Sequence, residues 1–156
     1  MHNSDIRVLS SVRQCDIAIE TNTESEMKLE HVILEEYIQP AGDIQIDCSN
    51  TLCVIYMIDG TKPNVKKEGS FVISLFNNPV FKENPVPILF AVNKSDLKNC
   101  KYNTLVYNEI ESEVGKLLQI EDYSFKKYAP CTLYSFNCSV LENNCKSFLE
   151  FIQATL

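Results

Sequence analysis

Apolar residues along this chain gather in three runs, each of which ends at polar residues. The first covers Thr51 to Ile58 and stops at Asp59-Gly60, the second covers Pro85 to Val92 and stops at Asn93-Lys94-Ser95-Asp96, and the third covers Cys131 to Cys138. Continuous apolar runs of this length predict strands that are buried on both faces of a sheet. The third run is less uniformly apolar, so we expect it at the sheet edge.

Helical stripes separate these runs. The predicted order from residue 51 is therefore β-α-β-α-β-α, which requires parallel strands with right-handed crossovers. Asn77-Asn78-Pro79 should end the first helix, and Asn103 or Thr104 should cap the second. The apolar faces are Phe71, Val72, Leu75 and Phe76, then Val106, Ile110, Val114, Leu117 and Leu118, and finally Cys145, Phe148, Leu149, Ile152 and Leu156.

The first fifty residues predict a β-hairpin. Residues 15–20 and 27–32 both alternate between apolar and polar positions, and the polar residues 21–26 between them predict a loose turn. His31 lies at a strand end without a patterned nucleophile or metal partner, so it is not a candidate catalyst. Ile33, Leu34, Tyr37 and Ile38 predict a short helix that ends at Pro40.

Composition narrows the class of protein. A chain of 156 residues with 45% apolar content fits one domain, here residues 1–156, and its net charge of −7 disfavours nucleic acid and anionic lipid as direct partners. No apolar stretch approaches the roughly 20 residues that span a bilayer. The seven cysteines are odd in number and form no Cys-x-x-Cys, which favours buried reduced thiols over zinc ligands or disulfides.

Polar residues at the end of a buried parallel strand lie where open α/β sheets bind ligands. In that position the carboxylate of Asp96 can accept two N–H bonds from one edge of guanine, and adenine offers no matching pair. Asn93 can bond another polar edge or brace the neighbouring loop, and the stem of Lys94 can lie along the ring. Asp59 also ends a strand, and we interpret it as a turn residue.

The sequence Asn93-Lys94-Ser95-Asp96, followed by a helix, a strand and Cys138-Ser139-Val140, resembles the C-terminal half of small GTPases of the Arf and Sar branch. The long spacing from Asp96 to Ser139, with Tyr123-Ser-Phe125 before the strand, resembles the β subunit of the signal recognition particle receptor. The resemblance implies a P-loop NTPase-like, mostly parallel sheet with helices on both faces. It also implies that Ser139 braces the loop while the amides of Cys138 and Val140 face guanine.

The chain departs from that family in its phosphate-binding half. It contains no Gly-x-x-x-x-Gly-Lys-Ser/Thr, and its four glycines are scattered, so the first strand, phosphate loop and first helix of the fold are missing. Mg²⁺ would bind only with such a loop upstream, and no residue matches a catalytic or metal-ligating role. We expect an N-terminally incomplete chain; residues 1–14 replacing the strand, or a degenerate GTPase, are the alternatives.

The resemblance implies a GTP-binding protein that anchors and regulates the receptor α subunit at the cytosolic face of the endoplasmic reticulum membrane during co-translational targeting. Membrane attachment would need a segment outside this chain. Three alternatives remain open at this point: a truncated Arf- or Sar-like trafficking GTPase, a GTPase-fold scaffold that binds no nucleotide, and an unrelated α/β module such as a flavodoxin-like one, in which Asn93 to Asp96 form only a turn.

Overall fold

The computed structural model describes residues 15–23, 26–34, 51–142 and 150–151, and of residues 15–34 it describes the backbone alone. The chain divides into two compact units, residues 1–43 and 44–156, which are taken here one at a time. That they form one domain stays a prediction.

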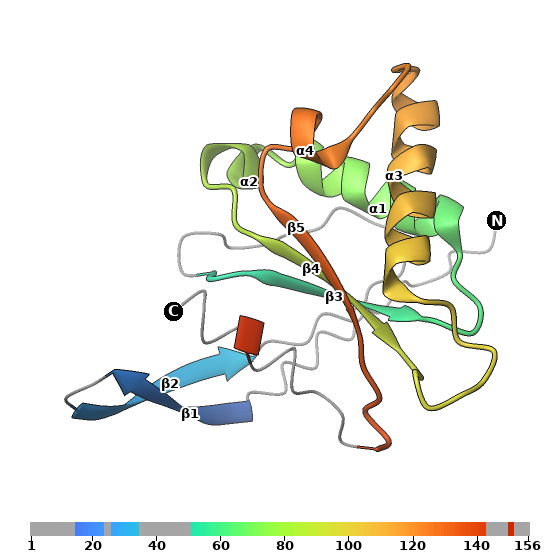
Figure 1. Cartoon of the computed structure of the whole chain (residues 1–156). Helices are drawn as coiled ribbons and strands as arrows, with labels where there is room; N and C mark the ends of the chain where they lie inside the picture. Colours follow the sequence, from blue (N-terminus) through green and yellow to red (C-terminus); the bar gives the residue numbers. More distant parts are fainter. Residues whose placement is uncertain (1–14, 24–25, 35–50, 143–149, 152–156) are drawn as a thin grey trace, which may run out of the picture. The chain divides into compact units, whose positions relative to one another are not determined.

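The first unit contains the predicted hairpin. Strands β1 (Cys15–Thr23) and β2 (Glu26–Leu34) pair antiparallel, from Cys15 opposite Leu34 to Thr23 opposite Glu26 (Figure 1). The predicted turn over residues 21–26 is too long, because the backbone ladder continues through polar residues that the alternation rule assigned to a loop. The predicted helix from Ile33 is wrong at its start, since Ile33 and Leu34 pair within β2. Its remainder lies outside the described residues.

The second unit is built on a parallel sheet of three strands in the order β3-β4-β5 (Figure 1). These are β3 (Val54–Asp59), β4 (Ile88–Asn93) and β5 (Leu133–Asn137). The five residues from Ile88 to Val92 are all buried, as expected of a central strand with apolar side chains on both faces. Within the described residues β3 and β5 are the two outer strands, and β5 was predicted there from its mixed composition. The prediction that the first run is buried on both faces is wrong for β3: only Ile58 is buried and Met57 is 49% exposed, because an outer strand has a neighbouring strand on one side only.

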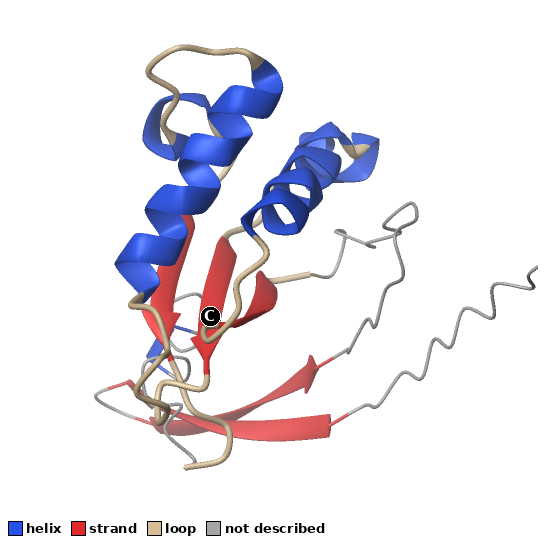
Figure 2. Ribbon diagram, turned by 90° about the vertical axis from the view of Figure 1, so that its right-hand side faces the viewer, coloured by secondary structure: helices blue, strands red, loops and turns tan. Residues whose placement is uncertain are grey.

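Two helices, α1 (Val65–Asn77) and α3 (Asn103–Leu118), lie side by side over one face of the sheet (Figure 2). Successive strand residues point to opposite faces, so Ile88, Phe90 and Val92 share the helix-covered face. They form one apolar cluster with residues of the helices and of the segment after α3. The fully buried members from outside the sheet are Val72, Leu75, Phe81, Val106, Ile110, Val114 and Phe125.

Asparagines set the ends of α1. The side chain of Asn64 accepts from the backbone N–H of Lys67 at 3.2 Å, which satisfies one free donor of the first turn. Asn78 ends α1 as predicted, and its side chain also caps the short helix α2 (Pro79–Glu83) by accepting from Val80 N at 2.9 Å. Proline at the first position of α2 has no N–H to satisfy there.

The second predicted helix begins where expected but is capped differently. Tyr102 is the N-cap residue of α3 and makes no side-chain cap bond. The backbone N–H of Asn103 instead donates to the side-chain oxygen of Asn137 at 2.8 Å, from the end of β5. The Asn103 side chain donates to the carbonyl of Ser135 at 2.8 Å. A distant residue therefore supplies the cap that local pattern assigned to Asn103 or Thr104.

The end of α3 shows another correction. Leu117 and Leu118 were predicted on the buried face, but they are 46% and 40% exposed. Gly115 is buried in their place, because Tyr123 in the following segment packs closely against it. A Cβ added at Gly115 would lie only 2.7 Å from the Cβ of Tyr123. That segment contains the short helix α4 (Phe125–Tyr128), and Phe125 packs into the core at 2% exposure.

The last predicted helix falls mostly outside the described residues, so helices on the second sheet face stay a prediction there. Within the described part of the chain, the structure contains no helix whose length and apolar character would let it cross a bilayer.

Candidate functional site

The carboxyl ends of β3, β4 and β5 lie side by side along one side of the sheet, because parallel strands in register end together. We call this side, where the three strands finish, the carboxyl edge of the sheet. Asp59 pairs with Asn93, and Val92 pairs with Asn137. Three segments begin at or just after the last residue of these strands: residues 59–61, 93–97 and 138–140, which we call the edge loops. They contain all six residues predicted to bind guanine nucleotide, namely Asn93, Lys94, Asp96, Cys138, Ser139 and Val140.

Asn93 connects two of the edge loops through one side-chain oxygen. Its Oδ1 accepts from the backbone N–H of Lys94 at 2.8 Å and from that of Val140 at 3.1 Å. Lys94 has a φ of 70°, which an L-residue seldom adopts, and the bond from its own N–H to Asn93 supports that turn. Asn93 is thus a brace between loops in this structure.

Asp96 and Ser139 form the second connection between the same loops. The Ser139 hydroxyl donates to Asp96 Oδ1 at 2.6 Å and accepts from the backbone N–H of Glu142 at 3.2 Å. Ser139 is fully buried. The contact matches the bracing role that the resemblance implied for Ser139, and it orients the carboxylate that we expect to read guanine. Guanine binding itself stays a prediction.

Backbone bonds join the two loops as well. The N–H of Ser95 donates to the carbonyl of Cys138 at 3.0 Å, and the N–H of Cys138 donates to the carbonyl of Val92 at 2.9 Å. Cys138 is 2% exposed and Val140 is 60% exposed. Because the Val140 N–H already donates to Asn93, it would have to be shared with, or released to, a base that approached it.

Asp59 has a role that sequence reasoning missed. Its Oδ1 accepts from Thr61 N at 3.0 Å and from Thr61 Oγ1 at 2.7 Å, which is the expected turn. Its Oδ2 also pairs with Lys94 Nζ at 2.5 Å. The hydrogen bond from Lys94, followed by those from Thr61, lowers the pKa of Asp59 to about 2. No local sequence pattern gives this pair, because it depends on the strand register that places Asp59 opposite Asn93.

Gly60 is required by a close approach of the first two edge loops. An added Cβ would lie 2.4 Å from Cys100 Sγ and 2.8 Å from the carbonyl oxygen of Asn93. The Gly60 N–H donates to that same carbonyl at 3.0 Å, and its own carbonyl accepts from Lys101 N at 2.8 Å. Burial raises the pKa of the Cys100 thiol, as do the nearby carboxylates of Asp59 and Asp96.

The edge loops can recognise a flat polar ligand, since they combine a braced carboxylate, an amide and a lysine stem.

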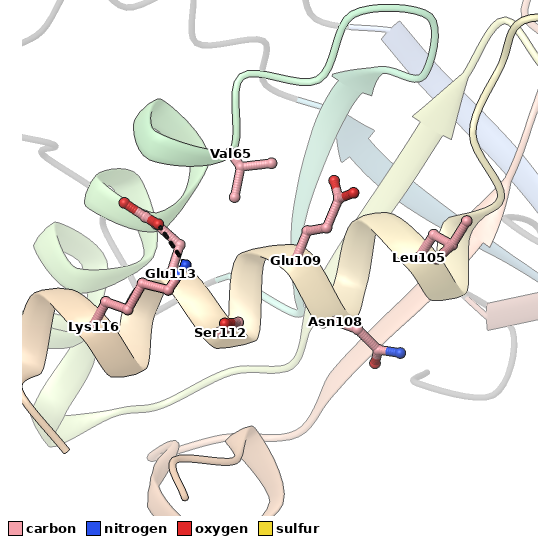
Figure 3. A pocket seen from close by; sticks show the side chains of 7 residues that line it. All are labelled: Val65, Leu105, Asn108, Glu109, Ser112, Glu113 and Lys116. Carbon is pink, nitrogen blue, oxygen red and sulfur yellow. Dashed lines mark ion pairs between the residues drawn. The ribbon is translucent and has the colours of Figure 1, made fainter. Parts of the chain in front are cut away.

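Within the described ranges there is no group of three or more His, Cys, Asp or Glu residues that could hold a metal ion. A shallow hollow of about 310 Å³ lies elsewhere, between α3 and the start of α1 (Figure 3). Its lining residues are Val65, Leu105, Asn108, Glu109, Ser112, Glu113 and Lys116.

This arrangement, in which parallel strands end in Asn-Lys-x-Asp and Cys-Ser-Val loops, defines the C-terminal part of a GTPase-like α/β domain. Similar solved structures have the same fold. One is the mammalian signal recognition particle receptor, at 13% identity and a TM-score of 0.65 over 94% of this chain and 85% of that one. Another is the receptor SRb-GTP/SRX complex from Chaetomium thermophilum, at 17% identity and a TM-score of 0.55 over 65% of this chain and 50% of that one.

The sequence comparison is more specific. Residues 38–150 match the family described as signal recognition particle receptor beta subunit, so the chain belongs to that family. A curated relative, the signal recognition particle receptor subunit beta of Dictyostelium discoideum, is 32% identical over 71 residues. That match covers 44% of this chain and 24% of the relative, so the chain matches about a quarter of the relative's length. The family match favours the receptor subunit over an Arf- or Sar-like trafficking GTPase.

Proposed function

We propose that this chain binds guanine nucleotide at the edge loops and pairs with the α subunit of the signal recognition particle receptor. The observation that carries the nucleotide proposal is the hydrogen bond between Ser139 and Asp96, together with the two bonds to Asn93 Oδ1. These contacts join two loops from distant parts of the chain into one polar surface.

The chemistry of recognition follows from Asp96. A carboxylate accepts hydrogen bonds through both oxygens, and guanine presents two donors, the ring imino N–H and the exocyclic amine, on one edge. Ser139 fixes Oδ1, which limits rotation of the carboxylate before the base arrives and lowers the entropy cost of binding. Charge-assisted bonds of this kind are stronger than neutral ones, so Asp96 should contribute most of the base selectivity.

The partner and the location rest on the family. The solved relatives include an SRb-GTP/SRX complex and an SRb-GDP-Mg structure from Chaetomium thermophilum, as well as the mammalian receptor. Their likeness to this chain supports GTP as the ligand and the receptor α subunit as the partner. The proposed site of action is the cytosolic face of the endoplasmic reticulum, where the pair would serve co-translational targeting.

The proposal covers binding and leaves hydrolysis unassigned. The sequence has no Gly-x-x-x-x-Gly-Lys-Ser/Thr to cradle phosphates and place Mg²⁺. In this proposal Asp96 and Asn93 contact the base, so neither is assigned a role toward an attacking water.

Comparing nucleosides that differ only in their base tests the nucleotide proposal. Isothermal titration of the expressed chain with guanosine, xanthosine and adenosine should show preference for guanosine. Asp96→Asn should shift that preference toward xanthosine, because an amide can donate to the extra carbonyl of xanthine. Asp122→Asn, at an exposed loop position, is the matched control and should bind as the native chain does. Guanosine binding without a shift in Asp96→Asn would contradict the assignment of Asp96.

A scaffold that binds no nucleotide is the second candidate, and one observation favours it. The groups at the edge loops already satisfy one another, since Val140 N–H donates to Asn93 and the Lys94 ammonium pairs with Asp59. Failure to bind guanosine, combined with co-purification of the receptor α subunit, would establish this alternative. Failure of both assays would contradict the whole proposal.

A further inference from the structure

The carboxylate of Asp59 is fixed before it meets Lys94. Two bonds from Thr61, one from its N–H at 3.0 Å and one from its hydroxyl at 2.7 Å, hold Oδ1. The second oxygen, Oδ2, then lies 2.5 Å from Lys94 Nζ. Asp59 is therefore an acceptor with a set direction, since its own strand-end turn determines where Oδ2 points.

Lys94 is fixed at its other end. Its backbone lies at a φ of 70°, and its N–H donates to Asn93 Oδ1 at 2.8 Å. The Lys94 side chain thus extends from its own loop after β4 to Asp59 at the end of β3. A lysine side chain that is free in solution samples many rotamers, and ordering it costs up to about 2 kcal/mol of conformational entropy. Here both ends are tied within the protein.

We propose that Asp59 is a positioning residue for base binding: it holds the Lys94 stem extended across the edge loops as a shelf for the flat face of guanine. The inference rests on the proposed function. It adds a third loop, residues 59–61, to a site that the sequence built from two. It also assigns the carboxylate a role beyond the turn that its position after a strand suggested.

The ion pair also determines what Lys94 contributes. An ammonium bonded to a carboxylate carries little net charge toward a ligand, but its methylene groups remain available for packing. Lys94 should therefore stabilise the base and sugar part of the ligand rather than attract its phosphates. Guanosine, which has no phosphate, is the appropriate probe for this role.

The effect of Asp59 on guanosine binding can be measured separately from its effect on folding stability. The Lys94 and Asp59 side chains are 46% and 40% exposed, and ion pairs this exposed contribute little to folding stability. Asp59→Asn keeps an oxygen for the bonds from Thr61 and removes only the charge that holds Lys94. We expect its melting temperature to stay close to that of the native chain while its affinity for guanosine falls.

A double-mutant cycle tests the proposal by isothermal titration with guanosine. Asp59→Asn should bind about two- to fivefold more weakly, the range expected for loss of an exposed pair. Lys94→Met removes the ammonium and keeps a stem. In the Lys94→Met background, Asp59→Asn should have no further effect, because its influence passes through Lys94. A purely structural role of Asp59 would weaken binding equally in both backgrounds, and that result would overturn the proposal.

Glu109→Gln is the matched control. Glu109 pairs with Lys101 at 2.7 Å, and the two side chains are 36% and 42% exposed, so this variant removes a comparable ion pair away from Lys94. It should bind guanosine as the native chain does. Native binding by Asp59→Asn would overturn this inference and leave the proposed function standing. A native chain that binds no guanosine would overturn both, so the two failures are distinguishable.

Discussion

Ser139 Oγ lies 2.6 Å from Asp96 Oδ1, although the two residues are 43 positions apart in the chain. The bond joins the loop after β5 to the loop after β4. The two loops follow strands β4 and β5, which pair along their length, so the strand register brings Asp96 and Ser139 together. The Ser139 hydroxyl then fixes the orientation of the Asp96 carboxylate. This contact is the central feature of the candidate site.

The first prediction concerns that contact. Ser139→Ala should lower the free energy of unfolding by about 1–2 kcal/mol, because a buried hydroxyl that both donates and accepts is lost. It should also weaken guanosine binding, since Asp96 would rotate more freely. Urea unfolding and isothermal titration measure the two effects. Ser124→Ala, at a cap position without a side-chain cap bond, should change neither. A fully stable Ser139→Ala would contradict the bracing role.

Two glycines give opposite expectations. Gly60→Ala should destabilise the chain by about 1–3 kcal/mol, because the new Cβ would meet Val92 Cγ1 and the Asn93 carbonyl oxygen, each at 2.8 Å. Gly69→Ala should be neutral or stabilising by up to about 1 kcal/mol. Its new Cβ would meet side chains alone, Glu113 Cγ at 3.1 Å and Leu117 Cδ1 at 3.6 Å, within a helix that gains from alanine. Denaturant midpoints compare them, and equal effects would contradict the close approach at Gly60.

The bond between Tyr56 and Glu68 joins the sheet to α1 beside the apolar cluster. The Tyr56 hydroxyl donates to Glu68 Oε2 at 2.5 Å, and Glu68 is 7% exposed. Tyr56→Phe should cost about 1–3 kcal/mol of unfolding free energy, because the buried carboxylate loses its donor. Replacing both residues, as Tyr56→Phe with Glu68→Met, should recover part of that loss.

Tyr102→Phe serves as the control for the Tyr56 prediction, since Tyr102 is 75% exposed. Its unfolding free energy should match that of the native chain. If Tyr56→Phe were equally silent, the hydroxyl bond to Glu68 would contribute nothing to stability.

Alkaline pH should destabilise the fold through Cys131. Burial raises the pKa of its thiol from 9.0 to about 11. The folded state therefore keeps a proton that the unfolded state releases, so this contribution is fully present below pH 9.0 and is lost as pH rises through about 11. Urea unfolding under reducing conditions across this range should show the decline, and Cys131→Ala should reduce its slope. An unchanged slope in that variant would assign the decline to other groups.

Local pattern was sufficient for the main elements of the second unit. The apolar run before Asn93 became β4 because a strand with side chains packed on both faces needs apolar residues at every position. Asn78 ended α1 as predicted, since asparagine and the following proline both interrupt a helix. Asn93, Lys94 and Asp96 were predicted for a related reason, since polar residues that stop a buried strand lie at its carboxyl end. Cys138, Ser139 and Val140 were predicted from the family resemblance, and ligand binding by all six stays a prediction.

Local pattern failed where a neighbour distant in the chain supplies the partner. Asn137 caps α3 from the end of β5, so the local cap candidates were wrong. Leu117 and Leu118 follow the apolar stripe of α3, yet both are exposed. The segment after α3 covers the other side of the helix end, where Tyr123 packs against Gly115. In β1, strand pairing depends on backbone bonds, so it extended through Thr21 to Thr23 despite their polarity.

The sequence by itself determined which residues end the strands and therefore which chemistry is present at the sheet edge. The tertiary structure alone decided their partners: Asp96 with Ser139, and Asp59 with Lys94. The physical reason is that a hydrogen bond or ion pair depends on ångström-scale distances, which follow from strand register and loop geometry. Periodicity specifies which face a side chain occupies, and it contains no information about which residue stands opposite.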